Sequence, residues 1–260
     1  MKPPIRAPEQ IRMLTQPLPV SMADSWFEYA EPAHFWMKAR FRVLNTLAGH
    51  LFRESAEIAE IGCGNGVVLR EIEDAYGMNV IGIDLNLEAL RNSWARKSAL
   101  VCYDIRQRAP EFANKFDVIL LCDVVEHIDN SAEFLDAVLY HLKTGGHIII
   151  NVPARQELFS NYDKRAGHVR RYSMRSLTDE LKESGLRIER ATYWGLTFYP
   201  ILILRKFMLL RDTGEQSTIQ RGFQAGSRFQ EKFMQFLARL DPLPNRLLGT
   251  SITAVVSRIP

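Results

Sequence analysis

The amino-acid sequence predicts an α/β fold, in which a doubly wound, mostly parallel sheet is covered by helices on both faces. Short apolar runs rich in β-branched residues recur at 57–61, 79–84, 99–103, 116–122 and 146–152. Helical segments at 66–76, 86–97 and 131–142 separate most of these runs. Apolar runs that alternate with helices are typical of parallel strands that are buried on both faces.

The first 50 residues show no strand pattern and are rich in large aromatic side chains. Between Ala33 and Leu51, apolar residues recur at intervals of three and four, which predicts an amphipathic helix. We therefore interpret residues 1–55 as a helical cap. The helix either packs on the edge of the domain or covers a binding pocket, with Trp36 as a candidate substrate contact. The aromatic side chains are Trp26, Phe27, Tyr29, Phe35, Trp36 and Phe41.

The carboxyl-terminal part predicts two more strands with a long insert between them. A helix at 174–184 leads into a strand at about 186–194, and an alternating run at 252–257 predicts the last strand. The insert, residues 195–250, is mainly helical in pattern and too long for a hairpin loop. We expect residues 56–194 plus 251–260 to form the main domain.

The insert allows three interpretations. Residues 201–260 hold 9 Lys and Arg against 4 Asp and Glu, and residues 196–211 are strongly apolar. A basic apolar helix of this kind either closes a pocket as a lid, lies on an anionic membrane surface or forms a dimer interface. We expect a monomer or a homodimer.

Composition and charge exclude several classes of protein. The chain has 260 residues, of which 47% are hydrophobic and 24% charged, values ordinary for a globular protein. It has no apolar stretch long enough to span a membrane, and no apolar run follows the basic residues near Met1. Cys63, Cys102 and Cys122 lack CxxC spacing, which favours a reducing compartment. With a net charge of +3, we expect a cytoplasmic protein that binds no nucleic acid.

A glycine-rich segment, Glu60-Ile61-Gly62-Cys63-Gly64-Asn65-Gly66, lies between the first predicted strand and the first helix. Glycines there let a ligand approach the backbone closely, and the helix N-terminus adds oriented N–H groups. A dinucleotide fingerprint requires another glycine at position 67, which is Val67. The spacing therefore argues against a nicotinamide cofactor.

Acidic residues end three further strands: Asp84, Asp104 and Asp123. The carboxyl ends of parallel strands meet at one edge of the sheet, so these side chains should converge on one crevice. There, Asp84 suits the hydroxyls of a ribose and Asp104 an adenine amino group. Taken alone, Asp84 or Asp104 is equally well explained as a helix N-cap or turn residue.

Together, Glu60–Gly66, Asp84, Asp104, Asp123–Ile128 and the turn at 143–146 resemble the motifs of class I S-adenosylmethionine-dependent methyltransferases. The resemblance implies a seven-stranded sheet with strand order 3-2-1-4-5-7-6 and an antiparallel seventh strand. It also implies S-adenosylmethionine as cofactor and S-adenosylhomocysteine as product. The implied cofactor contacts are Glu60, Gly62, Cys63, Gly64, Gly66, Asp84, Leu85, Asp104, Ile105, Cys122 and Asp123. Cys63 and Cys122 are otherwise small packing residues.

Methyl transfer to a hydroxyl needs a base, whereas a neutral amine needs only to be held unprotonated. His127 is the first candidate base, and His168 is the second catalytic candidate. The alternative for His127 is that it hydrogen-bonds the backbone and shapes the pocket floor.

Residues 163–173 form a basic cluster that resembles a block in a functionally mixed bacterial subgroup of these enzymes. Arg170, Arg171 and Tyr172 would clamp a carboxylate or phosphate of the substrate. The alternative is a solvated basic loop with Tyr172 as a packing anchor.

Asp123, Glu126, His127 and His168 resemble the metal-binding set of small-RNA 2′-O-methyltransferases, and some ubiquinone-pathway O-methyltransferases have a similar block. However, Asp-x-x-Glu-His-Ile is widespread in enzymes without metal, so we expect no metal here.

We thus predict a methyltransferase that acts on an oxygen or nitrogen of a small, partly hydrophobic or anionic acceptor. The alternatives are a quinone or lipid-linked saccharide as acceptor at the inner membrane surface, and a non-catalytic subunit that binds S-adenosylmethionine.

Overall fold

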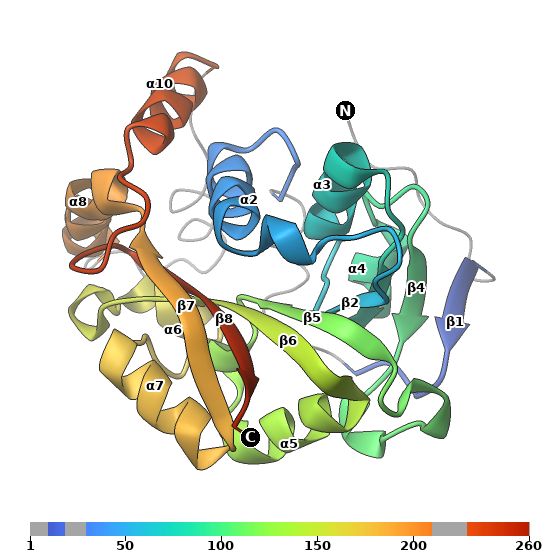
Figure 1. Ribbon diagram of the computed structural model, residues 1–260. Coiled ribbons are helices and arrows are strands. Elements are labelled where there is room, and N and C mark those ends of the chain that lie inside the picture. Colours follow the sequence, from blue (N-terminus) through green and yellow to red (C-terminus); the bar gives the residue numbers. More distant parts are fainter. Residues whose placement is uncertain (1–9, 19–29, 210–227, 260) are drawn as a thin grey trace.

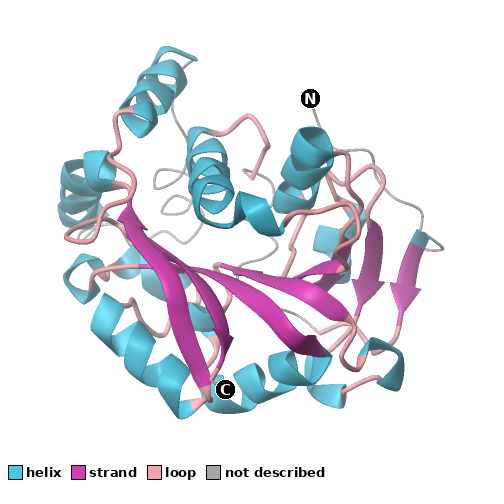
Figure 2. Cartoon of the chain, viewed as in Figure 1, coloured by secondary structure: helices cyan, strands magenta, loops and turns pink. Residues whose placement is uncertain are grey.

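The computed structural model describes residues 10–18, 30–209 and 228–259. They form one eight-stranded sheet between two layers of helices (Figure 1, Figure 2). Across the sheet, the strands lie in the order β1-β4-β3-β2-β5-β6-β8-β7. In chain order they are β1 (Ile11–Met13), β2 (Ile58–Ile61), β3 (Ile81–Asp84), β4 (Ala99–Cys102), β5 (Phe116–Cys122), β6 (Leu142–Pro153), β7 (Leu186–Trp194) and β8 (Ser251–Arg258).

Seven of these strands confirm the predicted fold class and strand order. The strands β4, β3, β2, β5 and β6 pair in parallel with one another, in that order. Strand β8 lies between β6 and β7 and is antiparallel to both. Numbered from β2 onward, this is the order 3-2-1-4-5-7-6 with the last strand antiparallel.

The eighth strand, β1, corrects the expectation that the first 50 residues hold no strand. It adds to the free edge of β4 in parallel, with Ile11 opposite Leu100 and Met13 opposite Cys102. Ile11 is buried, and the other two residues of the strand, Arg12 and Met13, are exposed. Three residues are too few to produce a recognisable alternating pattern, so this strand could not be predicted from the sequence.

Each face of the sheet is covered by its own layer of helices. Leu120 of β5 packs with one layer, whereas its neighbours Ile119 and Leu121 pack with the other. This alternation is the period of two that a strand buried on both faces requires. One layer is α2 (Phe35–Ala48), α3 (Val67–Tyr76) and α4 (Leu87–Arg91), and the other includes α5 (Ser131–His141) and α7 (Met174–Glu183).

The helix predicted over residues 86–97 is shorter than expected, because α4 ends at Arg91. The carboxylate of Glu73 accepts hydrogen bonds from the backbone N–H groups of Arg96, Lys97 and Ser98, at 2.7–3.1 Å. A side chain from α3 thus replaces the helical partners of these groups.

The predicted turn at 143–146 lies inside β6. Phe116 pairs with Leu142 and Val118 with His147, so residues 143–146 bulge out of the ladder. Gly145 adopts the left-handed backbone that this bulge requires, with φ of 79°.

In the insert, the described residues form α8 (Tyr199–Leu209) and α10 (Arg228–Arg239), which lie on the same side of the molecule (Figure 1). The guanidinium of Arg42 on α2 donates to the carbonyls of Ala238 and Asp241, both at 2.9 Å, and fixes the end of α10. None of the helices in the described ranges is long and apolar enough to cross a membrane. Trp26, Phe27 and Tyr29 lie outside the described residues.

Candidate active site

The loop between β2 and α3 is shaped by three glycines with left-handed backbone: Gly62, Gly64 and Gly66. A Cβ on Gly62 would lie 2.5 Å from Cγ2 of Val124, and one on Gly66 would lie 2.4 Å from Oγ of Ser93. A Cβ on Gly64 would meet no described atom within 4 Å beyond its chain neighbours, and Gly64 lines a cavity. Close packing therefore requires the outer two glycines, and the middle one leaves room for a ligand.

Asp84, the last residue of β3, connects this loop to the loop that follows β3 through hydrogen bonds. Its Oδ2 accepts from the backbone N–H of Gly64 at 2.7 Å, and its Oδ1 accepts from that of Asn86 at 2.8 Å. Burial raises the pKa of Asp84, and these N–H groups oppose the rise. Each carboxylate oxygen keeps a further lone pair, so the side chain can still accept from two ribose hydroxyls.

Asp104 is engaged differently. It caps the short helix Ile105–Gln107 by accepting from the backbone N–H of Arg106 at 3.1 Å. The guanidinium of Arg106 also donates to both carboxylate oxygens, at 2.9 and 2.8 Å. The N-cap interpretation of Asp104 therefore holds. Asp104 and Ile105 also line the cavity, and their contact with adenine stays a prediction.

Arg40 joins the helical cap to the sheet. This buried side chain of α2 donates to Oδ2 of Asp123 at 2.6 Å, just beyond the end of β5. Oδ1 of Asp123 accepts from Nδ2 of Asn151 at 2.7 Å, and Oδ1 of Asn151 accepts from the indole N–H of Trp194 at 3.0 Å. We did not predict Arg40 as a site residue. The sequence feature that could have indicated Arg40 is its position: it is a charged residue four places after Trp36, on the apolar stripe of an amphipathic helix.

Two more carboxyl groups lie near Arg40 without forming ion pairs. Glu60 and Glu71 are buried, and Oε2 of each has no hydrogen-bond partner among the described residues. Burial raises the pKa of both to about 8, against the opposing charge of Arg40. Both are mostly protonated near neutral pH, so the ion pair is that of Arg40 with Asp123.

An aromatic wall borders the cavity below α2. The ring of Trp36 lies 5.7 Å from that of Phe198, and Phe35 lies 5.4 Å from Phe198, measured between ring centroids. The sequence indicated Trp36 but not Phe198, which sits in a short 3-10 turn at Leu196–Phe198. Ile201, Leu202 and Met234 continue this apolar lining.

His127 lies in the turn that follows β5. Its Nδ1 donates to the carbonyl of Gly167 at 3.2 Å, because a carbonyl can only accept. The Nε2 atom is then the unprotonated nitrogen. Burial lowers the pKa of His127 to about 4, and the charge of His168 acts in the same direction. His127 thus hydrogen-bonds the backbone, as its alternative interpretation proposed, and also lines the cavity.

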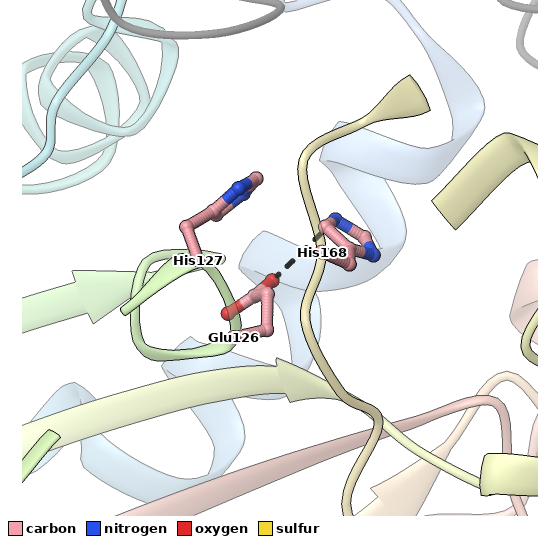
Figure 3. A group of neighbouring side chains, drawn as sticks. All are labelled: Glu126, His127 and His168. Atoms are coloured by element: carbon pink, nitrogen blue, oxygen red, sulfur yellow. Dashed lines mark ion pairs between the residues drawn. The ribbon is translucent and has the colours of Figure 1, made fainter. Parts of the chain in front are cut away.

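His168 is held by a buried carboxylate. Its Nδ1 donates to Oδ1 of Asp163 at 3.0 Å, and Asp163 lies in α6 (Asn161–Arg165). Burial alone would raise the pKa of Asp163, but the hydrogen bond from His168 and the charge of Arg171 hold it well below its usual range. Asp163 is therefore ionised and fixes the His168 ring, whose Nε2 lies 4.0 Å from Oε1 of Glu126 (Figure 3).

Glu126 completes the group shown in Figure 3. It is fully buried, and neither carboxylate oxygen has a hydrogen-bond partner among the described residues. Burial raises its pKa well above the usual range, and the charge of Asp123 adds to this. Ligand atoms of Glu126, His127 and His168 lie within 4.8 Å of one another, and oxygen and imidazole donors could hold a divalent cation. The expectation of no metal stays a prediction.

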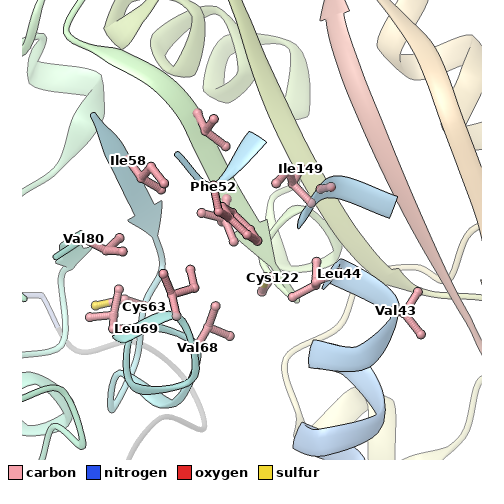
Figure 4. Packing of buried hydrophobic residues seen from close by; sticks show 14 of the residues in the cluster. Val43, Leu44, Phe52, Ile58, Cys63, Val68, Leu69, Val80, Cys122 and Ile149 are labelled. Atoms are coloured by element: carbon pink, nitrogen blue, oxygen red, sulfur yellow. The ribbon is translucent and has the colours of Figure 1, made fainter. Parts of the chain in front are cut away.

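The two cysteines at the cavity are packing residues. Cys63 and Cys122 lie among apolar side chains such as Leu69 and Leu44 (Figure 4). Burial raises the pKa of both thiols well above the usual range, so neither is a ready nucleophile.

In the basic loop, residues 163–173, other groups of the chain engage the side chains of the predicted clamp, which stays a prediction. Arg170 donates to two backbone carbonyls and pairs with Glu180 at 3.4 Å, and the hydroxyl of Tyr172 donates to Glu180 at 2.9 Å. Neither residue lines the cavity. Arg171 does, but its guanidinium is engaged by Asp163 at 2.7 Å. Acidic partners within the protein occupy the charges that we had assigned to a substrate.

One cavity of about 690 Å³ contains most of the predicted site. It lies at the carboxyl ends of the parallel strands, from β4 to β6. Of the predicted cofactor contacts, Gly66 alone does not line it. The predicted residues that do are Trp36, Glu60, Gly62, Cys63, Gly64, Asp84, Leu85, Asp104, Ile105, Cys122, Asp123, His127, His168 and Arg171.

Comparisons with known proteins agree with this geometry. A family model described as a methyltransferase domain matches residues 32–191. A ubiquinone biosynthesis O-methyltransferase from Marinobacter nauticus is 29% identical over 165 residues, covering 55% of this chain and 67% of the relative. The enzyme of the same name from Cronobacter sakazakii is 27% identical over 142 residues, covering 50% of this chain and 56% of the relative. The chain thus matches about half to two-thirds of the length of these relatives.

Solved structures share the fold. Phosphoethanolamine N-methyltransferase 2 of Haemonchus contortus, in complex with S-adenosylmethionine, superposes with a TM-score of 0.56. The two chains are 16% identical, and the match covers 86% of this chain and 53% of the other. The cavity fits that cofactor, because the open backbone at Gly64 and the acceptors of Asp84 meet the needs of a nucleoside ligand.

Proposed function

The chain belongs to the methyltransferase-domain family and is an S-adenosylmethionine-dependent methyltransferase, and from this premise we propose that it methylates a hydroxyl of a small, partly hydrophobic, ring-shaped acceptor. S-adenosylhomocysteine is the other product. The single observation that carries the proposal is the shared cavity: one continuous space holds the cofactor loop and, beyond Asp123, two histidines beside an aromatic wall.

His168 is the proposed general base. As the hydroxyl oxygen attacks, its proton passes to Nε2 of His168, while Asp163 keeps its hydrogen bond to Nδ1 and stabilises the imidazolium that forms. His127 offers a second acceptor nitrogen from the turn after β5. Bound S-adenosylmethionine supplies the electrophilic methyl group. The remaining task of the protein is to align the acceptor and exclude water.

The lining of the cavity supports the acceptor class. Trp36 and Phe198 give the cavity an aromatic lining suited to a planar acceptor, and Leu202 and Met234 offer apolar surface for a substituent. Arg170 and Tyr172 are engaged elsewhere, which argues against an anionic acceptor held by a clamp. Relatives named O-methyltransferases support oxygen rather than nitrogen as the methylated atom.

The test is an acceptor screen with labelled S-adenosylmethionine. We would compare four acceptors: a catechol with a short alkyl chain, the same catechol with a long chain, an aromatic amine of similar size and a free saccharide. Mass spectrometry would measure methyl transfer to each. We expect transfer to the catechols alone, and a benefit from the alkyl chain. Transfer to the amine alone would contradict the proposal.

The His168→Gln variant tests the base. We expect kcat to fall by roughly 10²- to 10⁴-fold, the usual contribution of a general base, with unchanged affinity for S-adenosylhomocysteine. In the matched His127→Gln variant, we expect a smaller fall in kcat. Both variants are assayed with and without a chelator. We expect the chelator to leave the activity of each variant unchanged. Full activity of His168→Gln, or loss of activity with the chelator, would overturn this role.

A further inference from the structure

We propose that the outer faces of α8 and α10 form a docking surface for an anionic lipid bilayer. Twelve large hydrophobic side chains are exposed among the described residues, and eight of them lie between residues 199 and 250. Single exposed hydrophobic residues are normal on a protein surface, but a gathered set marks an interaction site. Figure 1 shows the two helices on the same side of the molecule.

The exposed face of α8 is apolar. Ile203, Leu204 and Phe207 point away from the core, and the last two are 61% and 63% exposed. The opposite face is anchored: Leu202 packs against the core, and the ammonium of Lys206 donates to a backbone carbonyl at 2.6 Å. The apolar face is therefore held outward by contacts on the other side of the helix.

The exposed face of α10 combines apolar and basic side chains. Phe233 and Phe236 of α10 and Leu240, the residue just after its end, follow one another at spacings of three and four and are 49–57% exposed. Lys232 and Arg239 are also exposed, and they flank Phe236 on the same face at four residues before and three after. A helix with this pattern is suited to lie in the interface of an anionic membrane.

The charge of the docking surface favours an anionic bilayer over a second copy of the chain as its binding partner. Arg246 adds another exposed basic residue, whereas the acidic residues of the described range 228–250 are partly buried (Glu231) or buried (Asp241). Asp241 is also bonded internally, because it accepts from the backbone N–H of Gly195 at 2.6 Å. A symmetric dimer would place this basic face against itself, whereas anionic headgroups complement it.

The docking surface adjoins the acceptor end of the cavity. Ile201 and Leu202 of α8 and Met234 of α10 line the cavity, and other side chains of the same helices form the outer surface. An acceptor dissolved in the bilayer would therefore meet the enzyme where its own pocket is apolar. Docking itself does not depend on which atom is methylated.

Vesicle binding by the whole protein tests the proposal. Binding to vesicles of phosphatidylcholine alone would be compared with binding to phosphatidylcholine mixed with phosphatidylglycerol, by co-sedimentation. We expect clear binding to the mixed vesicles, weakened by salt, and little binding to the neutral ones. The Lys232→Gln and Arg239→Gln double variant should bind the mixed vesicles roughly 30-fold more weakly, since each basic residue near the surface contributes about a fivefold factor.

The Phe207→Ser and Phe236→Ser double variant should also lose vesicle binding. Matched controls are Met13→Ser, an exposed apolar residue on β1, and Arg175→Gln, a basic residue that is 92% exposed on α7. Neither should change vesicle binding, and all variants should bind S-adenosylhomocysteine normally in calorimetry. Equal binding to both vesicle types, or no binding to either, would overturn the proposal. So would a dimer, seen by light scattering, that the Phe207→Ser and Phe236→Ser variant abolishes.

Discussion

The two ends of the cavity are built in different ways. At the cofactor end, Gly62, Gly64 and Asp84 each lie within a few residues of a strand end, and backbone packing and backbone hydrogen bonds fix them. At the acceptor end, Trp36 and His168 come from segments more than 100 residues apart, and side-chain contacts place them. The sheet itself therefore determines the cofactor end, whereas the acceptor end depends on how the cap, the basic loop and the insert meet.

The largest expected effect on cofactor affinity comes from a glycine at the cofactor end. Gly62→Ala adds a Cβ that would lie 2.5 Å from Val124, at a φ of 75°. The left-handed backbone alone costs about 1–2 kcal/mol of unfolding free energy, and relief of the contact must move the loop. We expect the Kd for S-adenosylmethionine, measured by calorimetry, to rise about 100-fold, equivalent to about 2.8 kcal/mol.

Gly145→Ala is the control for backbone strain. Gly145 has a similar φ of 79°, and a Cβ there would meet no described atom within 4 Å beyond its chain neighbours. It lies in the β6 bulge, away from the cavity. We expect a comparable loss of stability and normal cofactor affinity. If both variants bind the cofactor equally well, the glycine loop does not determine the cofactor end.

This contrast explains what could be predicted from sequence. A strand end followed by a glycine loop is a local pattern, and the fold then brings Asp84 and Asp123 to the same edge, so short motifs located most of the residues that line this end of the cavity. Asp163 and Phe198 gave no such signal, since their roles arise from contacts with His168 and with α2. Only three-dimensional packing reveals those contacts.

The basic loop illustrates the same limit. A run of arginines in sequence shows charge but not which carboxylates face it. Glu180 lies on the next helix and engages both Arg170 and Tyr172, which an analysis of residues 163–173 alone cannot detect. The strand β1 escaped prediction for a related reason, because its partner β4 defines it and its own three residues do not.

A smaller effect compares two acids within the cofactor end. Asp84→Ala removes acceptors from two backbone N–H groups and from the cofactor, so we expect the Kd for S-adenosylmethionine to rise about 10- to 100-fold, given about 1.5–3 kcal/mol for a charge-assisted hydrogen bond. In Asp104→Ala the lost carboxylate was already paired with Arg106, so the rise should stay within about threefold. Calorimetric titration measures both.

The order of these two effects is the critical result. A larger loss for Asp104→Ala would mean that its carboxylate binds adenine in spite of Arg106. The cofactor end would then rely on a side chain that changes partners, as we describe for the acceptor end, and the contrast between the two ends would weaken.

The smallest expected effect is for Arg170→Ala, and it sharpens the description of the acceptor end. Arg170 is partly exposed and pairs with Glu180, so its loss should lower the unfolding free energy, measured in urea, by about 0.5–1 kcal/mol. Because its side chain does not line the cavity, the KM for the acceptor should not change. Arg171→Ala is the contrasting variant, since it removes a partner of buried Asp163 and thereby loosens His168, so kcat should fall while cofactor affinity persists. A rise in KM for Arg170→Ala would restore the clamp and extend the acceptor end beyond the cavity, whereas an unchanged KM leaves Asp163 and His168 as the pair on which this loop acts.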